Sequence, residues 1–260
     1  MLLLSILSLA ATAIAAPRAI ADCTRSVLEG ATADYIAAQT AGSSAGIKAL
    51  STSLNYTEND KAATVATGIL ATALKIDHTK STYDLTACAT YTELIITDTK
   101  LPSVIGTQMR FTNGQVTKMQ TLVTKKGDWL FDPASTLKWA KTEDWTTIPD
   151  AKRDTRAVIQ AAADAYLDIF KDKTVKVPWG TPCDRLEGGS YTGKGTATDS
   201  CNVGIPNNID LVNRRYVIDE TLGTVDVFLS FGGPTGRPDS HEFRIESGKI
   251  RYVHTLTVMT

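Results

Sequence analysis

Two segments of the chain carry apolar residues at helical spacing. In residues 23–39 the apolar and alanine positions recur every three or four residues, and residues 154–170 show the same period. This period predicts an amphipathic helix in each segment. A Gly/Ser-rich run at 41–46 follows the first helix and is typical of a loop.

Short alternating runs rich in β-branched and aromatic residues follow each helix and predict strands. The predicted strands span 91–97, 104–112 and 115–123 in the first half, and 215–218, 224–231, 242–245 and 249–258 in the second. Asn113-Gly114 and Ser247-Gly248 separate the last two runs of each half. Both pairs predict hairpin turns, because glycine readily adopts a positive φ.

The two halves repeat one template. The pattern Thr-Arg-x-Val-Leu/Ile-x-x-Ala-x-x-x-Tyr starts at Thr24 and again at Thr155, which is 131 positions later. Residues 109–116 align without gaps with residues 243–250, which are 134 positions later. Matched anchors at nearly one offset predict two domains of similar plan, each opening with a helix and closing with a hairpin.

These boundaries divide the chain into four parts. We expect a signal peptide at 1–21, a first domain at 22–126, a Trp-rich linker at 127–152 and a second domain at 153–260. Three of the four tryptophans lie in the linker. They either pack the linker against both domains or wall a ligand pocket, and the sequence leaves both interpretations open.

The first sixteen residues are uncharged and almost wholly apolar, and small residues follow at Ala13-Ile14-Ala15. This pattern is typical of a secretory signal peptide, so we expect a secreted protein. An oxidising route favours disulfides between the four cysteines. Four cysteines allow three pairings, and two in each half favour Cys23–Cys88 and Cys183–Cys201. Asn55-Tyr56-Thr57 is the single glycosylation sequon, which makes Asn55 the candidate acceptor.

Composition and charge exclude several classes of partner. With 43% hydrophobic and 21% charged residues and a net charge of −1, the chain has no broad basic face for nucleic acid and, after the leader, no stretch of membrane length. No cysteine spacing is CxxC and only three histidines occur, so we expect no metal. We expect no cofactor and an apolar small molecule as partner, and we leave a homodimer open.

The order of these elements carries a resemblance. A helix, a polar segment with a Tyr/Arg-x-Glu motif and an antiparallel sheet ending in a Gly-turn hairpin resembles the nuclear transport factor 2-like superfamily, particularly its SnoaL-like group. The residues that carry the resemblance are 54–59, 185–189, 215–225 and 241–250. The chain is also similar to the secreted two-domain proteins of filamentous fungi.

This resemblance implies an α+β fold with two tandem cone-shaped domains, each an N-terminal helix packed on a curved antiparallel sheet around an apolar pocket. The superfamily includes isomerases, dehydratases, polyketide cyclases and binding domains, so the fold by itself does not give the reaction.

A general acid or base is then expected on the concave face of the second domain. We predict four catalytic residues, Glu187, His254, Arg185 and Tyr191, and three residues that contact the substrate, Tyr166, Asp226 and Trp179. Arg185 and Glu187 either anchor and deprotonate a substrate or form an internal ion pair. His254 alternates onto a mostly apolar face, where it is either a proton shuttle or a satisfied core residue.

Three further expectations concern other candidate residues. Gln120 stands where the repeat places His254, which favours the second domain as the site. We interpret His241, which follows Pro238-Asp239, as an edge residue at a strand start. In the first domain, Glu93 is a candidate for a buried carboxylate with a raised pKa. If Asn55 is glycosylated, Tyr56 and Glu58 are expected near the outer surface.

The leading functional hypothesis is a secreted small-molecule-binding protein that acts as a cofactor-independent isomerase, dehydratase or cyclase on an apolar metabolite by acid–base chemistry. The alternative is a non-catalytic secreted binding or surface-interaction module. A pocket that exposes an unpaired histidine or carboxyl group favours the enzyme, and a pocket whose polar groups are all internally paired favours the alternative.

Overall fold

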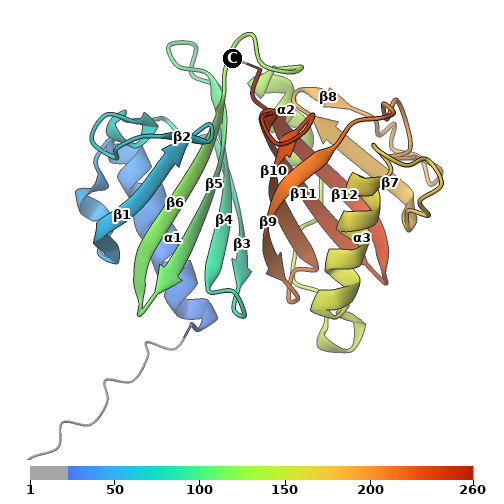
Figure 1. Ribbon diagram of the computed structural model, residues 1–260, viewed down its shortest axis with the longest axis horizontal. Coiled ribbons are helices and arrows are strands. Elements are labelled where there is room, and N and C mark those ends of the chain that lie inside the picture. Colours follow the sequence, from blue (N-terminus) through green and yellow to red (C-terminus); the bar gives the residue numbers. More distant parts are fainter. Residues whose placement is uncertain (1–22, 260) are drawn as a thin grey trace, which may run out of the picture.

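A computed structural model describes residues 23–259, so the predicted signal peptide lies outside the described residues. The protein is α+β and contains two six-stranded sheets, one in each half of the chain (Figure 1). The first half comprises α1 (Arg25–Ala41), β1 (Leu50–Glu58), β2 (Lys61–Ala62), β3 (His78–Asp84), β4 (Ala89–Ile96), β5 (Ser103–Thr112) and β6 (Gln115–Thr124), with 3-10 turns at Ser44–Gly46 and Ile69–Ala71.

The second half repeats this order after a linker helix. It comprises α3 (Arg156–Asp168), β7 (Trp179–Glu187), β8 (Ser190–Tyr191), β9 (Leu211–Asp219), β10 (Thr224–Phe231), β11 (Arg237–Glu246) and β12 (Lys249–Thr257), preceded by α2 (Pro133–Ala140) and a 3-10 turn at Asp150–Lys152. The strand orders β2-β1-β6-β5-β4-β3 and β8-β7-β12-β11-β10-β9 are identical in plan. The sequence repeat therefore reflects two copies of one topology.

Local sequence explains where the helices begin and end. The side chains of Thr24 and Thr155 accept hydrogen bonds from the backbone N–H groups of Val27 and Val158, so each helix has a threonine N-cap. Gly42 ends α1 with a φ of 66°, the left-handed conformation that glycine adopts without steric cost.

The resemblance implied an antiparallel sheet in each half, and this expectation is wrong for one pair of strands in each sheet. The pairs β1–β6 and β7–β12 run parallel, whereas all other neighbours are antiparallel. Parallel neighbours need a long crossover. In each half the chain between the two parallel strands passes through the other strands of its sheet, so no hairpin signal marks this pairing in the sequence.

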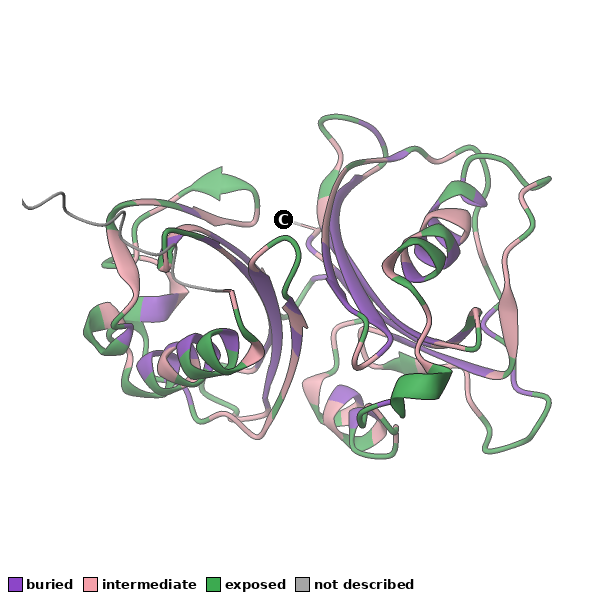
Figure 2. Cartoon of the chain, turned by 90° about the horizontal axis from the view of Figure 1, so that it is seen from below, coloured by how far each residue is buried: buried purple, intermediate pink, exposed green. Residues whose placement is uncertain are grey.

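One face of each sheet packs against the helix of its own half. Ile159, Ala163 and Tyr166 of α3 share a hydrophobic cluster with strand residues such as Phe243, and α1 forms a comparable cluster with the first sheet. Figure 2 shows each sheet curving around its helix. This arrangement creates an inner, helix-facing side on each sheet.

The opposite faces of the two sheets pack against each other (Figures 1 and 2). Ala89, Tyr91 and Leu122 of the first half form one cluster with Val217, Phe228 and Val258 of the second. Gln108 Nε2 donates a hydrogen bond of 2.6 Å to Asp226, and Arg156 forms two bonds of 2.7 Å with the Asp84 carboxylate. Both faces of each sheet are therefore buried.

The two disulfides confirm the pairing that the repeat favoured. Cys23–Cys88 joins the start of α1 to the β3–β4 turn region, and Cys183–Cys201 joins β7 to the long loop before β9. None of the helices in residues 23–259 has both the length and the apolar character needed to cross a membrane.

The linker tryptophans divide between the two roles that the sequence left open. Trp139 stacks on Tyr191 at a centroid distance of 4.5 Å, and Trp145 stacks on Tyr252 at 5.6 Å. These two rings fasten the linker to the second domain. Trp129 instead lies on the wall of a cavity.

Candidate functional site

A cavity of about 330 Å³ lies on the inner side of the second sheet. Its wall is mainly apolar and combines residues from α3, the strands, the loop before β9 and the linker: Trp129, Tyr166, Phe170, Arg185, Glu187, Gly204, Ile205, Pro206, Ile209, Phe231, Arg237, His241, Thr255, Thr257 and Met259. Three residues predicted from the sequence, Tyr166, Arg185 and Glu187, lie together in this wall.

Strand register explains why a polar row crosses the cavity floor. Glu187 pairs with Thr255 on the next strand, and Thr255 pairs with His241 on the strand after that. Residues directly opposite one another on neighbouring strands point to the same face. Asp239 and Thr257 form the next pair along the same face. The sheet therefore presents acidic, hydroxyl and imidazole groups to one apolar cavity.

His241 and Asp239 are the deepest polar groups of this row, with exposed fractions of 3% and 0%. His241 Nδ1 lies 3.5 Å from Asp239 Oδ2, and neither atom has a hydrogen-bond partner among the described residues. Burial, aided by the positive charges of Arg185 and Arg214, lowers the pKa of His241 to about 3. Burial also raises the pKa of Asp239 well above its ordinary value. Burial therefore favours the uncharged forms of both groups.

Arg185 is held rigidly in the cavity wall. Its guanidinium donates hydrogen bonds to the backbone oxygens of Cys201 (3.1 Å) and Val203 (2.6 Å), and it forms an ion pair with Glu187 at 3.2 Å. Glu187 also accepts a hydrogen bond of 2.7 Å from the Trp129 indole. Arg185 and Glu187 thus form the internal ion pair that was one of the two alternatives from the sequence, and both side chains line the cavity.

The prediction that His254 lies on the pocket face is wrong. The expected alternation along β12 holds, but it directs Thr255 and Thr257 to the cavity and His254 to the opposite face, between the two domains. Both faces of this strand are buried, so an apolar face did not identify the pocket side.

Asp226, which was predicted to contact the substrate, and Tyr191, which was predicted to be catalytic, do not line the cavity either. Asp226 pairs with Glu242 on the interdomain face, where it accepts hydrogen bonds from Gln108 and Ser240. Tyr191 pairs with Leu186, whose side chain points away from the cavity. Neither residue belongs to the cavity wall.

Trp179 does not line the cavity either. Its ring meets the ring of Tyr166 edge-on, with centroids 5.6 Å apart, at the margin of the hydrophobic core. Trp179 therefore packs against Tyr166, which lines the cavity, without lining the cavity itself.

His254 instead belongs to a buried charged cluster between the domains. Its Nδ1 lies 3.1 Å from Glu93 and its Nε2 contacts Glu143 of the linker, while Lys80 forms an ion pair of 2.7 Å with Glu242. Burial and Lys80 lower the pKa of His254, but Glu143 and Glu93 outweigh them and raise it to about 9. This histidine is protonated at neutral pH.

The same cluster corrects the expectation for Glu93. Its carboxylate is 1% exposed, as a buried base would be, and burial favours its neutral form. Lys80 and His254 outweigh burial and lower the pKa of Glu93 to about 2. Donor atoms of Glu93, Glu242 and His254 lie within 4.8 Å of one another, a spacing that a metal ion requires. The Lys80 ammonium already supplies a cation there, at 3.1 Å from His254 and 2.7 Å from Glu242.

The interpretation of His241 as an edge residue is also wrong. β11 begins at Arg237 and lies between β10 and β12, so His241 sits inside the sheet and not at its edge. A signal was present in the sequence: His241 lies two residues before Phe243, which the repeat alignment marks as a core position, and alternation puts both on one face.

The first domain has a glutamate and threonines in the equivalent row but neither the histidine nor the aspartate. The strand register places Glu58, Thr121 and Thr107 where the second domain has Glu187, Thr255 and His241. Ile105 pairs with Val123 as Asp239 pairs with Thr257. The strand positions of Thr107, Thr121, Ile105 and Val123 follow the 134-residue offset of the sequence repeat, whereas Glu58 and Glu187 are 129 positions apart. The imidazole and the buried carboxyl group therefore occur in the second copy alone.

Asn55, the predicted glycosylation residue, is exposed on β1, whereas its neighbour Tyr56 is 5% exposed and faces the core of the first domain. Adjacent strand residues point to opposite faces. The inference that an acceptor at Asn55 would place Tyr56 near the outer surface is therefore wrong.

A family model described as Domain of unknown function (DUF8021) matches residues 152–257. The match covers the second domain, including the row from Glu187 to His241, and states no activity. None of the curated proteins compared with the chain matches it.

Proposed function

We propose that the second domain binds an apolar small molecule in its inner cavity and acts on it by cofactor-independent acid–base chemistry, as an isomerase, dehydratase or cyclase. The observation that carries this proposal is the buried His241–Asp239 pair, in which His241 lines the apolar cavity and neither facing atom has a hydrogen-bond partner among the described residues. Buried polar groups without partners cost stability, so their presence in a pocket points to a function.

The chemistry follows from the two protonation states. Burial favours a protonated carboxyl group on Asp239 and a neutral ring with one proton on His241. When Asp239 donates its proton to Nδ1, the ring can release the proton on Nε2 to a ligand in the cavity. The reverse transfer removes a proton from the ligand. The pair thus acts as an acid in one direction and a base in the other, without a net charge before transfer.

The cavity supplies the remaining requirements of such a site. A volume of about 330 Å³ and an apolar wall suit a small apolar ligand, and burial excludes water that would compete for the proton. The rigid Arg185–Glu187 pair and the Thr255 hydroxyl, which has no hydrogen-bond partner among the described residues, provide polar contacts that orient a ligand.

The wider proposal extends to the fold family and the compartment. The helix enclosed by each curved sheet supports a tandem of cone-shaped, nuclear transport factor 2-like domains of the SnoaL-like type. The two disulfides support folding in an oxidising compartment and hence secretion.

Non-catalytic binding is the second candidate. It is favoured by Arg185 and Glu187, because their charges pair with each other and each side chain also bonds to another protein group. The two functions share the cavity and differ only in whether His241 transfers a proton.

Binding is tested with the neutral fluorophore N-phenyl-1-naphthylamine. We expect its fluorescence to rise on binding to the protein, and we expect Ile205→Trp, which fills the cavity wall, to abolish the rise. Val203→Trp is the matched control, because this neighbour is 52% exposed and does not line the cavity. Equal fluorescence in both variants would place the probe elsewhere.

Proton transfer is tested by hydrogen–deuterium exchange at carbon. A panel of apolar ketones incubated with the protein in D₂O should show faster exchange of α-protons by NMR, and His241→Phe should remove the acceleration. His78→Gln, in the first domain, is the control that also removes a histidine. Binding without accelerated exchange across the panel would favour the non-catalytic module.

A further inference from the structure

Arg237 stands apart from the other arginines of the protein. Among residues 23–259 it is the one arginine whose side chain has no hydrogen bond or ion pair with another protein group. The side chains of the others each have at least one: Arg25, Arg110, Arg153, Arg156, Arg185, Arg214, Arg215, Arg244 and Arg251. Arg237 is exposed at the start of β11. Its guanidinium is therefore a free cation on this surface.

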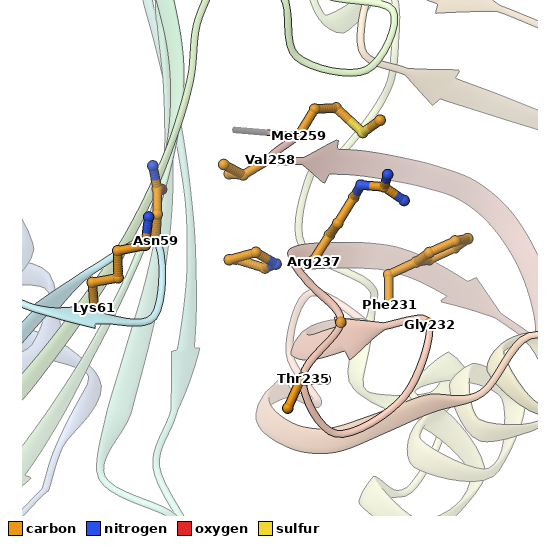
Figure 3. Close-up of a pocket in the computed structure, with 10 residues that line it drawn as sticks. Asn59, Lys61, Phe231, Gly232, Thr235, Arg237, Val258 and Met259 are labelled. Carbon is orange, nitrogen blue, oxygen red and sulfur yellow. The ribbon is translucent and has the colours of Figure 1, made fainter.

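This free cation lies at the mouth of the cavity. Arg237 belongs to the wall of the inner cavity and also to the wall of a more open groove of about 420 Å³ between the domains. Phe231 and Met259 are likewise shared by both. In Figure 3, the Arg237 side chain extends between Phe231 and Met259, and Asn59 and Lys61 of the first domain lie across from it. The groove thus leads into the cavity past Arg237.

The lining of the two spaces carries an uncompensated positive charge. Its charged residues are Lys61, Arg185, Arg237 and Glu187, which gives three positive charges and one negative, or a net charge of +2. Arg185 and Glu187 neutralise each other in their ion pair. Lys61 has no ion pair among the described residues, so the positive charge is concentrated at the mouth and absent from the depth.

The helix side of the cavity, opposite the polar row, is apolar and aromatic. Tyr166, Phe170 and Ile209 line it, while Phe231 lies near the mouth. A molecule that satisfies both regions has an apolar body and one anionic end. A guanidinium offers two parallel N–H donors to a carboxylate, a geometry that a lysine ammonium does not provide.

We propose that the cavity takes an apolar ligand with a terminal carboxylate, and that Arg237 binds this carboxylate at the mouth while Lys61 adds to the positive potential from the first domain. This assignment rests on the proposed binding cavity and narrows its ligand class. It also gives the first domain a role, because Lys61 of β2 contributes a charge to the entrance of the second domain's site.

The test measures the displacement of bound N-phenyl-1-naphthylamine by decanoate and by decanol, which share an apolar chain and differ in charge. We expect the wild-type protein to bind decanoate about tenfold more tightly than decanol at low salt, a ratio that corresponds to about 1.4 kcal/mol. Arg237→Gln should bring the two affinities together, Arg237→Lys should restore part of the preference, and Lys61→Gln should reduce it about twofold to threefold.

Lys249→Gln is the matched control, because it removes one exposed positive charge at the β11–β12 turn, away from the cavity lining. It should leave the decanoate preference intact. Equal affinities for decanoate and decanol in the wild type would overturn this inference while leaving the binding cavity in place. Equal weakening of both ligands by Arg237→Gln would also overturn it, since that result indicates a purely structural role.

Two more outcomes complete the test. A stronger and Arg237-dependent preference for decyl phosphate over decanoate would overturn the assignment of a carboxylate. Failure of the neutral fluorophore to bind the wild-type protein would overturn the binding cavity itself, and this result is distinguishable because it precedes any comparison of the two displacing ligands.

Discussion

The Nδ1 atom of His254 lies 3.1 Å from Oε2 of Glu93, so a side chain of β12 in the second domain contacts a side chain of β4 in the first. Both side chains are at most 3% exposed. The contact is one of several that join the two sheets through buried polar groups. It makes the pairing of the domains depend on the charges of individual side chains.

Glu93→Gln should destabilise the whole protein. The change leaves His254 and Lys80 with less compensating negative charge in a buried site, and breaking such a network from one side costs about 3 kcal/mol. Urea unfolding followed by tryptophan fluorescence measures the loss. Lys48→Gln, which removes the exposed partner of the surface ion pair with Asp34, should change stability by less than about 0.5 kcal/mol. A similar small effect for Glu93→Gln would contradict a charged interface.

Stability should fall at alkaline pH through His254. Its pKa is raised from 6.5 to about 9, so the folded state retains a proton that the unfolded state releases. The resulting stabilisation is fully present below pH 6.5 and is lost as the pH rises through about 9. A shift of this size corresponds to about 3 kcal/mol. Urea midpoints measured from pH 6 to 10 should decline in the wild type and decline less in His254→Gln.

Stability should also fall at acidic pH, through the Glu93 carboxylate of the same interface. Its pKa is lowered from 4.5 to about 2, so its stabilisation is present above pH 4.5 and is lost as the pH falls through about 2. Parallel pH profiles for the wild type and Glu93→Gln in this range would show that the carboxylate is not paired as described.

The sequence predicted local structure well where the signal was local. The hairpin turns at Asn113-Gly114 and Ser247-Gly248 are present, and the helical period located α1 and α3 within two residues at their starts. β1, β3 and β7 were not predicted as strands. β1 and β7 pair in parallel with strands far along the chain. Such pairing leaves no turn signal near the strand itself.

The site was predicted in part, and the missing part depends on packing between domains. Arg185 and Glu187 were found because a motif recurs in the repeat, and both line the cavity. His254 and His241 were exchanged in role because alternation separates the two faces of β12 without saying which one the other domain covers. That choice is made by contacts between residues more than 100 positions apart, such as His254 with Glu93.

Asp239→Asn should stabilise the protein at neutral pH and weaken proton transfer. The pKa of Asp239 is raised in the folded state, so the wild-type protein loses stability as the pH rises above the ordinary value of 3.8, whereas an amide of the same shape does not. We expect a gain of about 1–2 kcal/mol at pH 7 and little change at pH 3, measured by urea unfolding. The acceleration of α-proton exchange in ketones, which we attribute to His241, should be smaller in the same variant.

The control variant Asp77→Asn should change the free energy of unfolding in the opposite direction. Asp77 accepts hydrogen bonds from the backbone and side chain of Thr97, which lower its pKa. Asp77→Asn should therefore lose stability at pH 7 relative to pH 3. If Asp239→Asn behaved in this way as well, Asp239 would be a charged, paired carboxylate and not the proton donor of the proposed site.

Removal of the Cys183–Cys201 disulfide should damage ligand binding as well as stability. The bond closes a loop with a sequence separation of 18, for which the loss of stability is about 3 kcal/mol. The backbone oxygens of Cys201 and Val203 hold Arg185 in the cavity wall, and Ile205 of the same loop lines the cavity. Cys183→Ala combined with Cys201→Ala should therefore weaken the binding of N-phenyl-1-naphthylamine at temperatures where the protein remains folded.

The other disulfide separates this local effect from general destabilisation. Cys23–Cys88 spans 65 residues of the first domain, so its removal should cost about 4 kcal/mol, at least as much as removal of Cys183–Cys201. The cavity contains no residue near either of these cysteines, so the fluorophore should bind the folded Cys23→Ala, Cys88→Ala variant with wild-type affinity. Weaker binding in both double variants would tie affinity to overall stability. Weaker binding in the Cys183–Cys201 variant alone would show that this disulfide holds the cavity wall in place.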